Sequence, residues 1–323
     1  MKRLIVGDPH VKPDDLEDCE RLLSYIKSIV TKDTSIQDID FLGDMFHTMG
    51  VIHSEVLAFW TKWLYELSDI CTVNVIVGNH DQTPGKTAHS LLPFKNTDPN
   101  NLKIYDKPAT EGAISFLPYI HDNEEFVKAA NEAKGQVLYC HATFDGSQFE
   151  TGYYAKGGID PDLVKQKLII SGHLHTSQNL DNGRILYPGS PRWLTASDAN
   201  VDKHIWIVNE DWSFEKIPTD TVCSRIVKLE ERPGSTIDFF EPQANWRYLV
   251  DVHGPKAFVN ERKEFWADKS VKLRVFIERE KTISVKESKG IISEFGKFVE
   301  TFKSPNGTPS EVLKKMVSDR LAL

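Results

Sequence analysis

The stretch Leu4-Ile5-Val6-Gly7-Asp8-Pro9-His10 places an acidic residue and a histidine directly after a short apolar run. Polar residues also follow apolar runs at Gly43-Asp44 and at Gly78-Asn79-His80-Asp81. Apolar runs of this length are typical of strands buried in a sheet. In open α/β sheets ligands bind beyond the carboxyl ends of the strands, so this order predicts a shared site there.

Two further fragments repeat the pattern downstream. Cys140-His141 lies at the end of the apolar run at 137–140, and Gly172-His173-Leu174-His175 follows the run at 168–171. Together with His47, the fragments hold six of the eleven histidines. One such short motif is usually a turn or a core histidine, but five in order, each after a predicted strand, indicate a functional centre.

Apolar periodicity in the first 217 residues alternates between strand and helix. It predicts strands at 4–7, 39–42 and 73–77, and helices at 14–31, 54–67 and 124–133. This βαβ order predicts a mostly parallel sheet with helices packed against it. From Tyr187 onward strands occur alone, at 203–208 and 214–217, which predicts an antiparallel close to the domain.

A boundary near residues 218–224 separates this domain from a small α+β module. The module is predicted to contain strands at 226–229, 247–252 and 271–277 and helices at 236–240 and 288–302. Residues 303–323 are predicted to be a linker and a last helix. Thr308-Pro309-Ser310-Glu311 marks the start of that helix, because it combines a capping box with proline at the first helical position.

Composition and charge agree with two unequal domains in a chain of 323 residues. Residues 1–223 carry 20 Lys and Arg against 32 Asp and Glu, whereas residues 224–323 carry 19 against 15. The acidic front disfavours non-specific binding to nucleic acid, and the basic end can supply phosphate contacts. The four cysteines form no CxxC pair, and no apolar stretch approaches 18 residues, so we expect a cytoplasmic protein.

The fragments contain the residue types of a two-metal phosphoesterase. Two divalent ions about 3.5 to 4 Å apart hold the attacking and leaving oxygens, and a hydroxide held by the ions is the expected nucleophile. Asp44 is placed to bridge them. The first site would be completed by Asp8, His10 and His175, and the second by Asn79, His141 and His173. Imidazole and amide ligands favour Mn²⁺, Fe²⁺ or Zn²⁺ over Mg²⁺ or Ca²⁺.

His80 follows the Asn79 ligand directly and is expected to face away from the metals. A histidine in this place can protonate the leaving oxygen or stabilise the charged transition state. We therefore expect cleavage, but not metal binding, to depend on His80.

Taken together, the five fragments resemble the motifs of the calcineurin-like metallophosphoesterase superfamily over about residues 1–217. The resemblance implies an α/β fold, a four-layer α/β/β/α sandwich, for a catalytic domain at 1–220. Residues 43–47, Gly-Asp-Met-Phe-His, and 187–191, Tyr-Pro-Gly-Ser-Pro, are similar to SbcD-type DNA repair nucleases of bacteria and phages. That similarity implies a small C-terminal α+β capping domain at 221–302 that binds DNA.

The similarity to SbcD-type nucleases also implies an activity and partners. It implies Mn²⁺-dependent 3′ to 5′ exonuclease and single-strand endonuclease action on DNA ends in repair and recombination. It implies a homodimer formed through helices near residues 51–67, and an SMC-like coiled-coil ATPase as companion. The chain has no GxxxxGK stretch, so any ATP dependence must come from that partner. The last helix, within 303–323, can bind the partner or lie on the capping domain.

His47 departs from the superfamily pattern. In protein phosphatases of the superfamily the second motif continues to an Asp and an Arg, and that Asp orients the catalytic histidine; here His47 occupies the Asp position. The resemblance implies that His47 contacts DNA or stabilises the transition state. It leaves open which group orients His80.

Two alternatives remain open. A phosphatase or a cyclic or nucleotide phosphodiesterase would use the same centre, although the missing Asp-Arg pair and the basic terminal module argue against it. A catalytically silent scaffold would have lost ligands, whereas all seven candidates are present. Arg192 and Trp193, after the Pro-Gly-Ser turn, can meet a DNA backbone or form an ion pair and a core contact.

Overall fold

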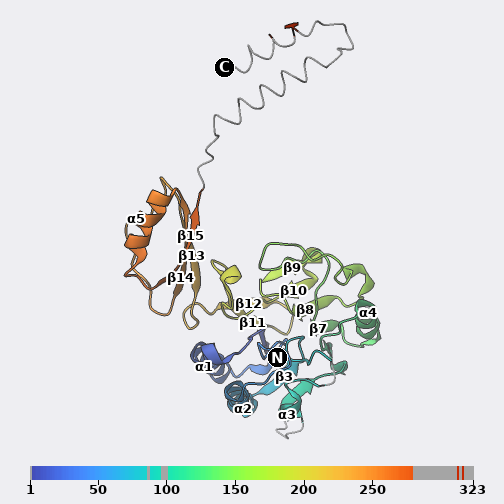
Figure 1. Cartoon of the computed structure of the whole chain (residues 1–323). Coiled ribbons are helices and arrows are strands. Elements are labelled where there is room, and N and C mark those ends of the chain that lie inside the picture. Colours follow the sequence, from blue (N-terminus) through green and yellow to red (C-terminus); the bar gives the residue numbers. More distant parts are fainter. Residues whose placement is uncertain (1, 86–87, 96–100, 279–310, 313–314, 316–323) are drawn as a thin grey trace.

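Two six-stranded sheets packed face to face form the larger part of the protein, and a three-stranded sheet with one helix follows (Figure 1). The computed structural model describes residues 2–85, 88–95, 101–278, 311, 312 and 315. The predicted helix at 288–302 lies outside the described residues. Of the last predicted helix, Glu311, Val312 and Lys315 are described, and they are helical.

The first sheet holds the strands that precede the first three motifs. Its order is β12 (Phe214–Pro218), β11 (His204–Val208), β1 (Lys2–Val6), β2 (Ile36–Phe41), β3 (Thr72–Ile76) and β4 (Leu102–Tyr105). Strands β1 to β4 are parallel neighbours, β11 pairs with β1 in antiparallel fashion, and β12 pairs with β11 in the same way. The predicted parallel strands and the predicted antiparallel strands at the end of the domain are therefore both confirmed.

The second sheet holds the strands that precede the two downstream motifs. Its order is β5 (Ala109–Glu111), β6 (Ile114–Leu117), β7 (Val137–His141), β8 (Leu168–Gly172), β10 (Ile185–Tyr187) and β9 (Gln178–Leu180). The four inner strands are parallel, and both edge strands are antiparallel to their neighbours. Several of these strands are only three or four residues long, too short for a period-2 pattern to reveal them.

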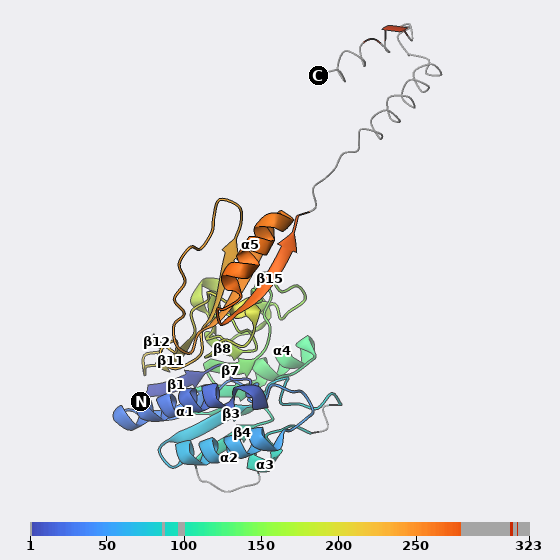
Figure 2. The same ribbon diagram turned by 60° about the vertical axis from the view of Figure 1, so that its left-hand side comes forward.

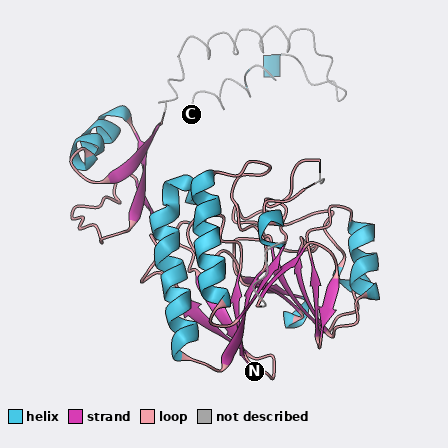
Figure 3. Ribbon diagram, turned by 90° about the horizontal axis from the view of Figure 1, so that it is seen from below, coloured by secondary structure: helices cyan, strands magenta, loops and turns pink. Residues whose placement is uncertain are grey.

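Helices cover both outer faces of the paired sheets (Figure 3). They are α1 (Leu16–Lys32), α2 (Ser54–Ser68), the short α3 (Leu92–Lys95) and α4 (Asn123–Glu132). Single 3-10 turns lie at η1 (Pro13–Asp15), η2 (Pro161–Leu163), η3 (Asp181–Gly183) and η4 (Ala196–Asp198). One apolar core joins α1 and α2 to the first sheet, a second joins α4 to the second sheet, and a third lies between the sheets. These are the three interfaces of the predicted four-layer α/β/β/α sandwich.

Helical spacing of apolar residues explains why α1 packs as predicted. Leu22, Leu23, Ile26 and Val30 share one stripe, and each is buried. The tryptophans of α2, Trp60 and Trp63, are also buried in the first core, as expected from their place in an amphipathic helix. None of the helices in the described part of the chain has the length and apolar character needed to cross a membrane.

The C-terminal module has a parallel sheet in the order β13 (Ile226–Glu231), β14 (Arg247–Gly254), β15 (Val271–Ile277). Its helix, α5 (Lys256–Trp266), connects β14 to β15 and lies along the small sheet (Figure 2). The predicted helix at 236–240 is wrong, because that segment is an irregular connection between β13 and β14. Pro242 follows too closely for a stable helix to form there.

Helix α5 was missed by the sequence analysis, although a helical signal is present. Phe258 and Val259 are followed seven residues, or two helical turns, later by Phe265 and Trp266, and Val259 and Trp266 are buried against β14 and β15. Pro255 stands immediately before the helix and is its N-cap residue. The helix therefore replaces the predicted one as the α element of an α+β module.

Glu231 is the buried polar anchor of this module. It accepts hydrogen bonds from Arg262 (Nη2 to Oε1, 2.6 Å), from the Trp266 indole (2.9 Å) and from the Ile237 amide (2.9 Å). Arg262 is itself buried, so it depends on Glu231 as its counterion.

We predict that Glu231→Ala destabilises the module by about 3 kcal/mol, because it leaves the buried Arg262 charge unpaired. Urea unfolding followed by tryptophan fluorescence measures this loss. Glu230→Ala is the control, because the adjacent Glu230 side chain is 45% exposed. Equal unfolding midpoints for the two variants would contradict the anchoring role of Glu231.

Candidate metal centre

The five motifs meet where the carboxyl ends of the two sheets face each other. Asp8, Asp44 and Asn79 follow the parallel neighbours β1, β2 and β3. His141 ends β7 and His173 follows β8, its parallel neighbour in the second sheet. Each sheet therefore contributes one half of the centre, and all the motif side chains come together, as the following distances show.

The first group of donor atoms lies around His10. Its Nε2 is 3.0 Å from Nε2 of His175 and 3.4 Å from Oδ2 of Asp44. Asp8 Oδ2 is fully buried and has no hydrogen-bond partner among the described residues. Asp8 Oδ1 lies 3.6 Å from Nδ1 of His141. Two imidazole nitrogens this close, with an oxygen of Asp44 beside one of them, are arranged as ligands of one cation.

The second group of donor atoms lies around Asn79. Its Oδ1 is 2.8 Å from Nε2 of His141 and 2.7 Å from Nδ1 of His173, and these two nitrogens are 3.2 Å apart. Oδ1 of Asp44 is 3.4 Å from Nε2 of His141. The two oxygens of Asp44 therefore face different groups, which is the geometry of a bridging carboxylate.

The donor set fits divalent metal ions at two positions. Among the described residues, one cluster of potential ligand atoms comprises His10, Asp44 and His80, and another comprises Asp44, His141 and His173, with the atoms of each within 4.8 Å of one another. Asp44 is common to both. Nitrogen and oxygen donors of this kind suit Mn²⁺, Fe²⁺ or Zn²⁺.

Burial controls the protonation of the histidines. It lowers the pKa of His173 to about 3, helped by the neighbouring His141, and it lowers the pKa of His10 well below its ordinary value. Burial also opposes protonation of His141, but Asp44 and Asp8 outweigh it and raise the pKa of His141 to about 9. A metal cation would take the place of that proton, so metal binding should release it.

The two carboxylates respond differently to the same surroundings. Burial raises the pKa of Asp8. Burial acts in the same direction on Asp44, but His141 and His10 overcome it and hold the pKa of that carboxyl below its usual range. Asp44 is therefore ionised even before a cation binds.

Three of the candidate ligands adopt a backbone conformation that most residues avoid. The φ angle is 45° at His10, 52° at Asp44 and 87° at His173. Such angles are costly and are maintained only where neighbouring contacts enforce them. Here the His10 amide donates to the Asp44 carbonyl (2.9 Å), and the His173 amide donates to Oδ1 of Asp8 (2.7 Å).

His80 lies closer to the donor groups than the sequence analysis expected. Its ring centroid is 4.6 Å from that of His10, and one of its nitrogens belongs to the cluster with His10 and Asp44. The expectation that it faces away is therefore not met, because its amide donates to Oδ1 of Asp44 (2.8 Å) and draws the residue inward. The group that orients its ring is the His47 carbonyl, which accepts a hydrogen bond from Nδ1 at 2.6 Å.

The His47 ring lies beside the same cluster. It is stacked on His80 with centroids 6.0 Å apart and is 5.5 Å from the His10 ring. Burial lowers the pKa of His47, and Lys12 and His80 act in the same direction. His47 therefore contributes a neutral ring next to His80.

Three residues near the centre were missed or misjudged from the sequence. Oε1 of Glu150 lies 4.0 Å from Nδ1 of His175, and Lys203 contacts the main chain of His175; no motif marks either residue. The suggestion that Arg192 meets a DNA backbone is wrong, because its side chain is 1% exposed and bonds to the main chain of Pro9 and His10. Trp193 is a core residue, the other possibility considered.

Comparison with known proteins relates this centre to phosphoesterases. Residues 1–177 match the family described as Calcineurin-like phosphoesterase. A protein of Invertebrate iridescent virus 6, provisionally named phosphoesterase 244L, is 27% identical over 204 residues, covering 58% of this chain and 69% of the viral protein. A subunit of the nuclease SbcCD from Rhodobacter capsulatus is 30% identical over 129 residues, covering 36% of this chain and 32% of its own length.

Two solved structures also align with the chain. Nuclease MPE of Pseudomonas putida aligns with a TM-score of 0.32 at 14% identity, covering 63% of this chain and 83% of the nuclease. A cold-active protein-tyrosine phosphatase of Shewanella also aligns with a TM-score of 0.32, at 13% identity, covering 67% and 80% of the two chains.

Asp44 lies so close to Gly78 that a substitution at Gly78 tests the position of Asp44. A Cβ atom added there would lie 2.2 Å from Oδ1 and 2.3 Å from the amide nitrogen of Asp44. We predict that Gly78→Ala displaces Asp44 and weakens the binding of both metal ions, as measured by calorimetric titration with Mn²⁺. Gly183→Ala is the control for backbone strain without a clash, because φ is 88° there but a Cβ meets nothing within 4 Å. Unchanged binding in Gly78→Ala would contradict the bridging position of Asp44.

Proposed function

The chain belongs to the calcineurin-like phosphoesterase family, and we propose that it is a metal-dependent DNA nuclease of the SbcD type, which acts on DNA ends in repair or recombination. Family membership makes it a hydrolase of phosphoesters. The observation that carries two-metal hydrolysis is that the two oxygens of Asp44 face two separate groups of donor atoms, with one nitrogen of His80 in the first of them. The sequence similarity to a subunit of the nuclease SbcCD favours DNA as the substrate.

The residues of the centre bind the metal ions or orient the residues that bind them. We assign Asp8, His10 and His175 to one metal position and Asn79, His141 and His173 to the other, with Asp44 shared. When bound, the two ions supply an ionised water at neutral pH and stabilise the attacking and leaving oxygens. The ring of His141 is fixed by the Leu42 carbonyl, which accepts from Nδ1 at 2.8 Å and leaves Nε2 for the site.

His80 is the proposed proton donor. Its Nδ1 hydrogen is committed to the His47 carbonyl, so a second proton can bind only at Nε2. A protonated His80 therefore holds a transferable proton at Nε2, on a ring whose position is fixed by His47 and by the Asp44 contact. We assign His47 a supporting catalytic role, either toward DNA or toward the charge that develops in the transition state.

Several observations favour DNA as the substrate and Mn²⁺ as the metal. The chain is similar in sequence to a subunit of the nuclease SbcCD, and its basic end begins at the C-terminal module. We propose that this module, residues 221–302, caps the centre and contacts DNA phosphates. The donors, a mixture of imidazoles, carboxylates and an amide, suit Mn²⁺, Fe²⁺ or Zn²⁺, and of these Mn²⁺ is the metal that the similarity to SbcD-type nucleases implies.

The proposed partners follow from the same relationship. We propose an SMC-like coiled-coil ATPase as companion, with residues 303–323 as the contact, and a homodimer as the working form. The dimer surface would include the segment before α2, where Met49, Val51 and Ile52 are 43%, 53% and 41% exposed. Such neighbouring exposed apolar residues are typical of interaction sites.

A phosphatase or nucleotide phosphodiesterase is the second candidate function, because two-metal centres of this kind serve phosphatases as well as nucleases. With Mn²⁺ present, we predict that the purified protein degrades linear duplex and hairpin DNA and leaves p-nitrophenyl phosphate intact. Gel analysis of end-labelled DNA and release of p-nitrophenol measure the two activities. Asp44→Asn is the control for contaminating nucleases. Hydrolysis of the monoester alone would establish the phosphatase.

We predict that His80→Ala retains two bound metal ions and loses DNA cleavage by about a hundredfold or more, the usual contribution of a general acid. Single-turnover cleavage and metal analysis of the same preparation separate the two effects. His89→Ala replaces a histidine whose ring contacts Asp106 and no candidate ligand among the described residues, and it should cleave normally. Near-normal cleavage by His80→Ala would refute its role, and loss of a metal ion would instead make His80 a ligand.

A further inference from the structure

Two buried cations in one segment contact the main chain of two candidate metal ligands. We call residues 190–203 the retaining segment; it lies between β10 and β11. Arg192 and Lys203 are only 1% and 3% exposed. Neither residue belongs to a metal-binding motif, and charged side chains are rarely buried this deeply without a specific partner.

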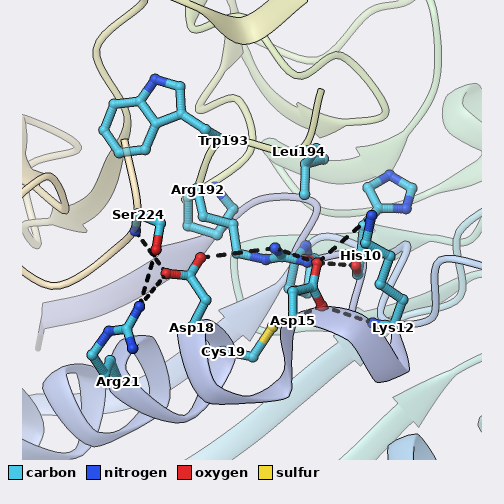
Figure 4. Close-up of polar contacts among 12 residues, drawn as sticks. His10, Lys12, Asp15, Asp18, Cys19, Arg21, Arg192, Trp193, Leu194 and Ser224 are labelled. Atoms are coloured by element: carbon cyan, nitrogen blue, oxygen red, sulfur yellow. Dashed lines mark hydrogen bonds and ion pairs between the residues drawn. The ribbon is translucent and has the colours of Figure 1, made fainter. Parts of the chain in front are cut away.

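Arg192 holds the loop that carries His10. Its Nε donates to the Pro9 carbonyl (2.9 Å) and its Nη2 donates to the His10 carbonyl (2.6 Å). Nη1 is paired with Asp15 at the start of α1 (2.8 Å), so the guanidinium is neutralised and fixed (Figure 4). His10 has a φ angle of 45°, which is costly for a residue other than glycine. The hydrogen bonds from Arg192 stabilise this backbone conformation.

Lys203 holds His175 in an equivalent way. Its Nζ donates to the His175 carbonyl (2.7 Å) and to the Ser190 hydroxyl (2.9 Å), and Asp198 is its counterion at 2.5 Å. The Ser190 amide donates to the same His175 carbonyl (3.1 Å). The retaining segment therefore contacts His175 from two points.

These contacts favour one metal position over the other. His10 and His175 both belong to the first group, with their Nε2 atoms 3.0 Å apart. The second group is held by other contacts, such as the Leu42 carbonyl to the His141 ring and the Asp8 carboxylate to the His173 amide. Among the candidate ligands in the part of the chain that the structure describes, Arg192 and Lys203 donate to His10 and His175 and to no member of the second group.

The retaining segment is fixed to the rest of the protein on its other side. Thr219 donates from its hydroxyl to the Pro191 carbonyl (2.6 Å) and from its amide to the Lys203 carbonyl (3.1 Å). In the C-terminal module, Nη2 of Arg247 donates to the Trp193 carbonyl (2.9 Å). The position of the two cations is therefore set from outside the metal centre.

We infer that Arg192 and Lys203 are positioning residues that align His10 and His175, so that affinity for metal at the first position, but not at the second, depends on them. The inference rests on the proposed two-metal centre. Hydrogen bonds from a charged donor are stronger than neutral ones, and outer contacts of this kind typically change metal affinity by about ten- to a hundredfold.

Mn²⁺ titration of Arg192→Met and Lys203→Met, by calorimetry and by electron paramagnetic resonance, tests the inference. We expect one of the two Mn²⁺ affinities to fall by about tenfold or more, with the other unchanged. The resonance signal of coupled Mn²⁺ pairs should then give way to that of single ions at stoichiometric metal. Arg184→Met is the matched control, because Arg184 also donates to main-chain carbonyls, those of Pro161, Val164 and Gln166, but contacts no candidate ligand among the described residues.

Arg192→Lys keeps the charge with fewer directed donors, and it decides the question if a methionine variant fails to fold. It should weaken the same single Mn²⁺ position. Two unchanged affinities, or an equal loss at both positions, would overturn the inference and leave the two-metal centre in place. Fewer than two Mn²⁺ ions bound by the wild-type protein would instead contradict the proposed function itself.

Discussion

The carboxylate of Asp44 is the interaction on which the rest of the centre depends. One of its oxygens faces His10 and the other faces His141, so a single side chain joins donor atoms from the two sheets. This is possible only because β2 ends against β7 and β8 across the sandwich, and because Gly78 leaves room beside the carboxylate. The fold therefore brings two sets of ligands, each at the ends of strands of one sheet, to the carboxylate of Asp44.

Much of this arrangement could be predicted from the sequence, because it is encoded locally. A buried parallel strand and the polar residues at its end are adjacent in the chain, so the motifs revealed both β1 to β3 and the side chains that follow them. Features set by tertiary contact could not be found in this way. The inward position of His80 depends on the Asp44 carboxylate and the His47 carbonyl, and Arg192 became interpretable only once its burial was known.

The errors in the C-terminal module have a different origin. The five-residue segment at 236–240 contains apolar residues, but Pro242 ends any helix before its first turns are complete. Helix α5 has apolar residues at helical spacing, but the residues before and after it form strands β14 and β15, and the helix was not predicted. The module meets the larger part of the protein at Trp193, which joins it to the segment that contacts His10 and His175. The C-terminal module is therefore connected, through this segment, to the contacts that hold His10 and His175.

The measurement that tests the central claim most directly is anomalous X-ray diffraction from crystals soaked in Mn²⁺. Two anomalous peaks about 3.5 to 4 Å apart, one on each side of the Asp44 carboxylate, are the expected result. The ligand groups around His10 and Asn79 should each surround one peak. A single peak, or two peaks that do not share Asp44, would contradict the account.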